Sequence, residues 1–224
     1  MITIDDAARA DLRARQGAGA RYDAPGAPAA QLAWARRGTA YFARLLNDLS
    51  PADLDRPSRM PGWSRRHLVA HVAYNGRAFA NMAGAVRAGD PAPLYPSVDM
   101  RTAEITRGAT LPDRALRHLF QHAEVHLNVE WRDLTDGDWQ KSGTGLDGAP
   151  LPIADTPLLR ARELWLHALD LDAGARARDV PRDLLAALAA DADTTPDAYL
   201  ATHAMGRRPL GQPSPSDMPE DWPF

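Results

Sequence analysis

The stretch RARELWLHALDL, residues 160–171, combines a helical pattern with ionisable side chains on one face. Glu163 and His167 are four residues apart, so in a helix they lie on the same side, one turn apart. At about 100° per residue, Asp170 points the same way, together with two leucines. Charged groups in such a sector need a partner or a metal. A solvated Glu–His ion pair is the alternative, but the flanks are also apolar: Leu158, Trp165 and Leu169.

The composition is that of an ordinary globular protein. The chain has 224 residues, a formal net charge of −3, 45% hydrophobic residues and 25% charged residues. This suits one substantial domain or slightly more. The charge lacks the basic excess of nucleic-acid-binding proteins. No apolar run approaches the roughly 20 residues that span a bilayer, and the polar N-terminus is not a signal peptide, so we expect a cytoplasmic protein without membrane or nucleic-acid partners. A monomer and a homodimer both remain open.

The chain contains no cysteine. This excludes a disulfide framework, thiolate metal ligands and a cysteine nucleophile. Any metal must therefore be held by His, Asp or Glu side chains.

Apolar residues at spacings of three and four predict an all-α fold with four long amphipathic helices. They are expected over residues 28–49, 65–87, 112–134 and 157–174. Ser64 is a good N-cap for the second helix, and Pro112 suits the first turn of the third. A short helix is expected over residues 100–107, within the long connection 88–111, and a loop or small hairpin over residues 135–154. Four such helices with one long crossover predict a bundle, a fold that often holds metals in its core.

The predicted organisation has three parts. Residues 1–26 form an N-terminal arm with a possible helix from Asp5 to Arg15. Residues 27–176 form the bundle. Residues 177–224 form a short C-terminal extension, with one helix over 181–192 and a proline-rich tail.

Helical projection selects a third candidate ligand. His71 lies near the inward face of the second helix, which also carries Asn75, whereas His67 projects toward the flank. With Glu163 and His167, it gives two imidazoles and one carboxylate, which leaves a coordination position open, as in catalytic zinc sites. The alternative for His71 is a core histidine bonded to a carbonyl.

Three further histidines form a row at every fourth position of the third helix. His118 points almost opposite the predicted core face, His122 lies well off it, and His126 reaches only its flank. A solvated row is therefore favoured over a metal array.

Three segments together resemble the mycothiol-dependent maleylpyruvate isomerases, which belong to the DinB-like four-helix metalloproteins. They are PSRMPGWSRRHLVAHVAYNGRAF (57–79), APLYPSVDMRTAEITRGA (92–109) and LLRARELWLHALDL (158–171). The resemblance covers about residues 30–175, and its middle segment points to the isomerase branch. It implies a divalent metal, usually zinc, held by His71, Glu163 and His167.

The resemblance also implies a reaction, the conversion of maleylpyruvate to fumarylpyruvate by reversible addition of a thiolate. Because the chain has no cysteine, a small thiol must be the cofactor: mycothiol by resemblance, with ergothioneine, bacillithiol or glutathione as alternatives. The family's second domain contributes an arginine, a part that Arg207 or Arg208 could play here.

Several side chains are candidates for binding the dianionic substrate or the thiol. Arginines suit carboxylates, because guanidinium binds them in a bidentate manner. Asp170 could orient His167 as a neighbour of the metal site or bond to another helix. The alternative for each arginine, taken singly, is a surface or structural role. The remaining candidates are Asn75, Tyr95, Arg101, Arg160, Arg162 and Arg207.

Two other functions fit the same pattern. One is a metal-dependent S-transferase that conjugates a small thiol to an electrophile. The other is a non-catalytic binding protein that kept the bundle and lost the chemistry, and an intact set of three ligands argues against it.

Overall fold

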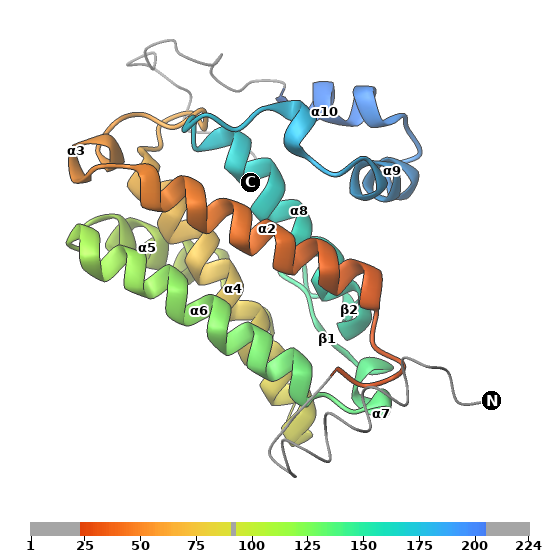
Figure 1. The fold of residues 1–224 in the computed structure, drawn as a ribbon. Coiled ribbons are helices and arrows are strands. Elements are labelled where there is room, and N and C mark those ends of the chain that lie inside the picture. Colours follow the sequence, from red (N-terminus) through yellow and green to blue (C-terminus); the bar gives the residue numbers. More distant parts are fainter. Residues whose placement is uncertain (1–22, 91–92, 205–224) are drawn as a thin grey trace, which may run out of the picture.

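The computed structural model describes residues 23–90 and 93–204, and it is an all-α, DinB-like bundle with a C-terminal extension (Figure 1). Its four long helices are α2 (Ala29–Asp48), α4 (Arg65–Ala88), α6 (Asp113–Asp133) and α8 (Thr156–Asp170). The predicted fold class is therefore confirmed. Helix α4 packs along α6, and α2 packs along α8, while α4 also contacts α8 and α5. The contact between α4 and α8 matters most, because these two helices carry the candidate ligands.

Local signals fix where α4 begins. The side chain of Ser64 accepts a hydrogen bond from the backbone amide of His67, as the predicted N-cap requires. At the other end Gly89 adopts a left-handed conformation (φ 79°) that ends the helix. The register of His71 within the bundle follows from this start.

Helix α8 ends at Asp170, four residues before the predicted end near Gly174. The backbone turns there, with φ of 54° at Asp172 and 94° at Gly174. The buried side chain of Arg65 donates to the carbonyl of Leu171 at 2.8 Å and also bonds the carbonyl of Asp172. The freed carbonyls at the end of α8 are thus satisfied by a residue about 100 positions away, which no local pattern indicates.

The connections contain short elements. Helix α3 (Pro51–Leu54), which was not predicted, starts with a capping box between Ser50 and Asp53. Helix α5 (Val98–Ala109) confirms the short helix predicted in the long connection and is longer than expected. After α7 (Asp136–Trp139), strands β1 (Ser142–Thr144) and β2 (Pro150–Pro152) pair antiparallel, with Gly143 opposite Leu151, so the hairpin alternative is confirmed. The 3-10 turn η1 (Ile153–Asp155) then leads into α8.

Helix α5 packs closely against α4 at Gly108, where any larger residue would clash. A Cβ atom at Gly108 would lie 2.7 Å from the ring of Tyr74 and 2.8 Å from the Cβ of Ala70. Both residues belong to α4, in the turns around His71. This close packing sets α5, and Arg101 on it, beside the candidate site.

The C-terminal extension holds more structure than predicted. The turn η2 (Ala177–Asp179) precedes α9 (Arg182–Asp191), the expected helix, and a second helix, α10 (Pro196–Ala204), follows. The expectation of a single helix was therefore wrong. Thr195 accepts a hydrogen bond from the amide of Ala198, and Pro196 occupies the first turn, so a local start signal was present. The expected helix from Asp5 to Arg15, the rest of the arm up to residue 22, and the tail from residue 205 lie outside the described residues.

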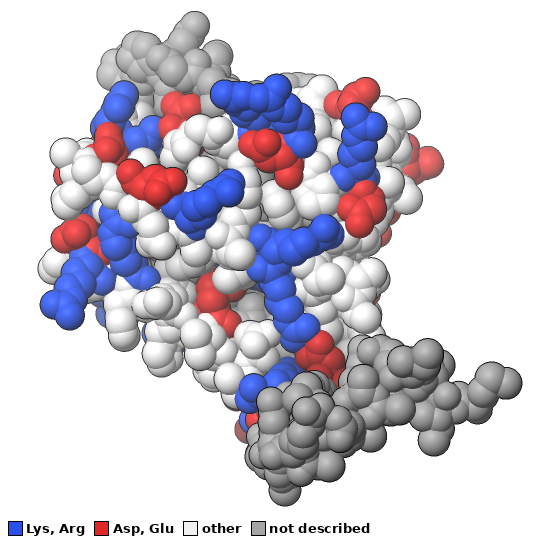
Figure 2. Space-filling model, in the orientation of Figure 1, with Lys and Arg blue, Asp and Glu red and all other residues white. Residues whose placement is uncertain are grey.

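The surface carries both signs of charge. The face in Figure 2 shows acidic and basic side chains interspersed over the helices, without a broad basic field. Within residues 23–90 and 93–204, no helix combines the length and the apolar character needed to cross a membrane.

Candidate metal centre

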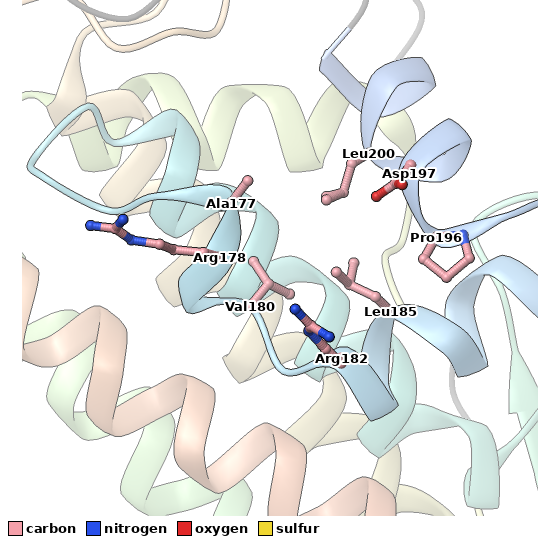
Figure 3. A pocket seen from close by; sticks show the side chains of 8 residues that line it. All are labelled: Ala177, Arg178, Val180, Arg182, Leu185, Pro196, Asp197 and Leu200. Carbon is pink, nitrogen blue, oxygen red and sulfur yellow. The ribbon is translucent and has the colours of Figure 1, made fainter.

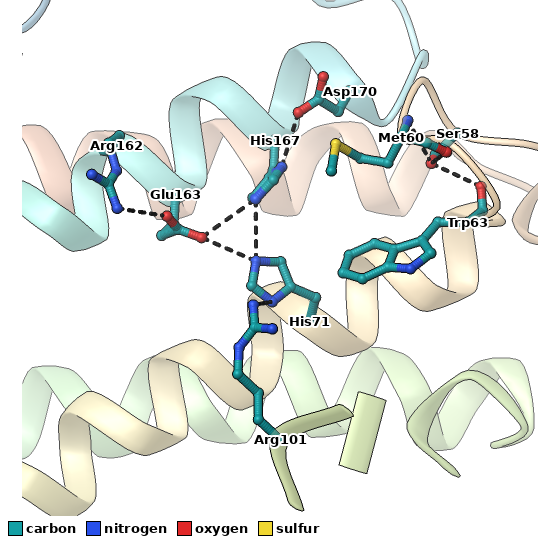
Figure 4. Close-up of polar contacts among 9 residues, drawn as sticks. All are labelled: Ser58, Met60, Trp63, His71, Arg101, Arg162, Glu163, His167 and Asp170. Atoms are coloured by element: carbon teal, nitrogen blue, oxygen red, sulfur yellow. Dashed lines mark hydrogen bonds and ion pairs between the residues drawn. The ribbon is translucent and has the colours of Figure 1, made fainter. Parts of the chain in front are cut away.

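Three side chains from two helices converge in the bundle. His71 comes from α4, and Glu163 and His167 come from α8, with one potential ligand atom from each within 4.8 Å of the others (Figure 4). Nε2 of His71 lies 3.0 Å from Oε2 of Glu163 and 3.1 Å from Nε2 of His167. Nε2 of His167 lies 3.3 Å from the same carboxylate oxygen. The helical projection thus selected three residues that the fold brings together.

The spacing of these atoms fits a divalent metal. A tetrahedron with bonds of about 2.0–2.1 Å has ligands roughly 3.3 Å apart. The three observed separations are 3.0, 3.1 and 3.3 Å. Two imidazoles and one carboxylate also form the donor set of catalytic zinc sites, which keep a further position for a water or substrate. Both the chemistry and the separations therefore suit zinc or a similar ion.

A neighbouring carboxylate orients one imidazole. Nδ1 of His167 lies 2.9 Å from Oδ2 of Asp170, which is fully buried. Because an ionised carboxylate can only accept, the proton of a neutral His167 sits on Nδ1. Its Nε2 then faces Glu163 and His71 with a lone pair. Asp170 thus contacts the site within its own helix, as one of the two sequence interpretations expected.

Burial and hydrogen bonds shift the pKa values of the three convergent side chains in different directions. Burial lowers the pKa of His71 to about 4, so this imidazole is neutral near pH 7. Burial would raise the pKa of Glu163, but hydrogen bonds from His167 and His71 outweigh it and hold the pKa well below its usual value. Burial would lower the pKa of His167, yet its bonds to Asp170 and Glu163 raise it. His71 is therefore neutral and Glu163 ionised near pH 7, whereas a metal ion at this site would compete with a proton for His167.

The triad opens into a cavity of about 400 Å³. Asn75, Tyr95, Arg101 and Arg162, all singled out from the sequence, line it. Nη2 of Arg101 lies 3.2 Å from Nδ1 of His71, and its guanidinium lies 5.7 Å from the centre of the Tyr95 ring. The structure places these four side chains at the site, and their roles remain predictions.

Arg160, in contrast, does not line this cavity and has the structural role that was the alternative for each arginine candidate. It is fully buried and donates to the carbonyl of Val72 at 2.8 Å and to Oδ1 of Asn75 at 2.6 Å. It also forms an ion pair with Glu124 of α6. Arg160 can be buried because Glu124 is buried beside it and neutralises its charge. The helical pattern of the sequence did not show this pairing. Arg207 lies outside the described residues.

Sequence reasoning missed part of the cavity wall. The ring of Trp63 lies 5.5 Å from that of His71, centre to centre. Tyr199 and His203 reach the cavity from α10. Trp63 precedes the Ser64 N-cap of the helix that carries His71, so its place in the sequence could have indicated that it lies near the site. No pattern in the sequence near α10 indicates that this helix reaches the cavity. Five further residues line the cavity and were not predicted to do so: Met60, Phe79, Leu94, Leu146 and Leu159.

Four other histidines, at positions 67, 118, 122 and 126, do not line this cavity. His118 and His122 are exposed, and Nε2 of His126 lies 3.5 Å from Glu130. His67 bonds Ser64 at 2.8 Å. Among the described residues, His71, Glu163 and His167 form the one group of three that is arranged to hold an ion. The prediction of a solvated row is consistent with this exposure.

A second, larger hollow of about 500 Å³ lies between η2, α9 and α10 (Figure 3). Arg178, Arg182 and Asp197 stand at its rim beside apolar side chains. None of the three triad residues lines it. The three residues that are arranged to hold an ion therefore belong to the other cavity.

The bundle that carries this site is similar to known proteins. Residues 35–172 match the family model of the mycothiol maleylpyruvate isomerase N-terminal domain. The crystal structure of a mycothiol-dependent maleylpyruvate isomerase is similar, with 37% identity and a TM-score of 0.71 over 73% of this chain and 68% of that chain. A histidine-to-alanine mutant structure of such an isomerase matches with 36% identity, the same TM-score and the same coverage. No curated protein matches the sequence. The matched region contains all three convergent residues, and the chain belongs to the mycothiol maleylpyruvate isomerase family.

Proposed function

We propose that this chain is a metal- and thiol-dependent isomerase that converts maleylpyruvate to fumarylpyruvate. The observation that carries the proposal is the convergence of His71, Glu163 and His167 on one cavity, within the region that matches the family. The similarity to mycothiol-dependent maleylpyruvate isomerases supports the reaction and the thiol.

The reaction requires that a C=C double bond becomes single for long enough to rotate. Addition of a thiolate to one alkene carbon moves the π electrons into the conjugated carbonyl and leaves an enolate. After rotation, the enolate re-forms the double bond and expels the thiolate, so neither oxidation nor net loss of thiol occurs. Because the chain contains no cysteine, the thiol comes from a small cofactor, for which mycothiol is the proposal.

The proposed ligands of the metal are His71, Glu163 and His167. The chemistry that a bound divalent ion supplies is Lewis-acid acidification of a thiol, which provides thiolate near neutral pH. Asp170 holds the proton of His167 on Nδ1 and so keeps Nε2 available as a donor atom. Glu163 brings the single negative charge of the set, which would offset part of the charge of a divalent ion.

Arg101 is the proposed partner of a substrate carboxylate. It lies at the cavity beside His71 and over Tyr95, and it presents a planar donor group. A guanidinium can only donate, so in this contact Nδ1 of His71 accepts. A His71 that ligates a metal through Nε2 carries its proton on Nδ1 and cannot accept there, so the contact between Arg101 and His71 would be lost when the metal is bound.

The test is an assay of maleylpyruvate loss with the full chain and a panel of thiols: mycothiol, bacillithiol, glutathione and ergothioneine. We expect isomerisation with mycothiol, without net thiol consumption, that a chelator abolishes and added Zn²⁺ restores. Stoichiometric thiol consumption would assign the chain to the S-transferases instead. Isomerisation that persists after complete metal removal, or its absence with every thiol, would refute the proposal.

A further inference from the structure

Asn75 is held in a single orientation beside the triad. It lies on α4 one turn after His71, lines the same cavity and is only 7% exposed. Its Oδ1 accepts a hydrogen bond from Nη1 of Arg160 at 2.6 Å. Because a guanidinium has no acceptor, the amide oxygen must face Arg160, and the NH₂ group must point the other way. Within the described part of the chain, this NH₂ group makes no hydrogen bond.

The orientation is fixed by groups from all four long helices. Arg160 of α8 also donates to the carbonyl of Val72 on α4 and pairs with Glu124 of α6. The second carboxylate oxygen of Glu124 accepts from the hydroxyl of Thr39 on α2 at 2.7 Å. A flip of the Asn75 amide would place two donors against Arg160 and leave a buried cation without one of its acceptors.

A glycine on α4 leaves space for this hydrogen-bond network. A Cβ atom at Gly76 would lie 3.0 Å from Nη2 of Arg160 and 3.1 Å from Oε1 of Glu124. Glycine at this position therefore gives the guanidinium and the carboxylate room to meet against α4. The arrangement supports a fixed donor at the cavity wall rather than a polar side chain left there by chance.

We propose that Asn75 is a substrate-binding residue that donates a hydrogen bond to a negatively charged substrate oxygen, and that Arg160 is the residue that positions it. This rests on the proposed function and deepens it. The acceptor is either a carboxylate of the bound substrate or the carbonyl oxygen that gains charge when the thiolate adds. A neutral, preorganised donor serves both, because it requires no reorganisation when charge develops.

The decisive variant is Asn75→Asp. It keeps an oxygen for Arg160 and replaces the NH₂ donor by a second acceptor. With metal-loaded full chain, mycothiol and maleylpyruvate, we expect kcat to fall about 10²–10³-fold if the donor acts on developing charge. We expect a raised KM at unchanged kcat if it binds a carboxylate in the ground state. Wild-type kcat and KM in this variant would overturn the proposal.

A matched control is available on the surface. Asn128 of α6 is exposed, and its Oδ1 accepts from Nε of Arg36 at 2.9 Å, so it makes the same kind of contact away from the triad. Asn128→Asp should leave kcat, KM and metal content unchanged. Equal losses in both variants would show a general effect of the substitution and would overturn the proposed role.

A second measurement does not depend on turnover or on the folding of Asn75→Asp. The side-chain ¹⁵NH₂ resonance of Asn75, assigned by its loss in Asn75→Ser, should shift when maleate is titrated into the metal-loaded wild-type chain. No shift, together with a wild-type kcat in Asn75→Asp, would overturn the role of Asn75. If wild-type protein fails to isomerise maleylpyruvate but this resonance shifts, the proposed reaction is wrong and the dicarboxylate-binding role of Asn75 stands.

Discussion

Replacing Arg160 with methionine tests whether the buried network stabilises the bundle. The guanidinium is fully buried, and the side chain of its partner Glu124 is only 9% exposed. Methionine keeps much of the apolar stem but leaves the carboxylate of Glu124 without its countercharge. Removing one member of a buried ion pair typically costs about 3–5 kcal/mol, because the remaining charge stays desolvated. For a chain of this size, about 2–4 °C per kcal/mol converts this cost into a fall in Tm of about 6–20 °C.

The assay is thermal and urea unfolding followed by circular dichroism, with metal content held constant between samples. The second variant is Arg160→Met combined with Glu124→Gln, which removes the orphaned charge while an amide can still bond Thr39. Because the cost lies in the unpaired charge, the double variant should recover at least half of the loss. The matched control is Arg36→Met, which removes a part-exposed arginine bonded to Asp23 at 2.6 and 2.7 Å. Such a surface pair contributes about 1 kcal/mol or less.

Two results would refute this reasoning. One is a fall in Tm for Arg160→Met that is no larger than the fall for the Arg36→Met control. The other is a double variant no more stable than the single variant. Either would show that Glu124 reaches solvent or another partner when Arg160 is lost, and that the network contributes orientation without stability.

Further predictions concern the metal and the pH dependence of stability. His167→Ala should bind less than about one metal per chain and lose activity while keeping its helical circular dichroism, whereas His122→Ala should match wild type; metal analysis showing full occupancy in His167→Ala would contradict the ligand assignment. Asp170→Asn should weaken metal affinity about 10- to 100-fold in chelator competition, because it weakens the partner that orients His167; unchanged affinity would exclude that role. Hydrogen bonds from Lys141 and Thr135 lower the pKa of Asp138 to about 2 from 3.8. A depressed pKa stabilises the fold above the unfolded value, so this contribution, about 1 kcal/mol after solvent screening, should be present above pH 4 and vanish as the pH falls toward 2; a wild-type advantage over Asp138→Asn that stays constant across this range would contradict it.

The parts of the fold that depend on neighbouring residues were readable from the sequence. Spacings of three and four located all four long helices, and the hydroxyl of Ser64 marked the start of α4. Because that start fixes the helical phase, projection could also place His71 toward the candidate site. Glu163 and His167 were paired by their spacing alone. The convergence of the triad needed one assumption beyond this, that α4 and α8 face each other.

The end of α8 and the role of Arg160 were not readable, because both depend on partners far away in the sequence. Arg65 satisfies carbonyls beyond Asp170, and Glu124 neutralises Arg160 inside the bundle. In a helical pattern, an isolated charge looks the same whether it faces water or a buried counterion. Arg160 and Glu124 meet next to Gly76, where a Cβ atom would contact both side chains. Only the packed structure shows that the two charges lie there.

The cavity wall has two parts, one inside and one outside the region that matches the family model. The triad, Asn75 and Arg101 all lie within residues 35–172, the region shared with the family model. Tyr199 and His203 reach the same cavity from α10, outside that region. On the proposed function, the metal and the activation of the thiol would therefore belong to the shared bundle. The phenol and the imidazole of α10 would then act on the choice of thiol or substrate, because they reach the same cavity without belonging to the triad.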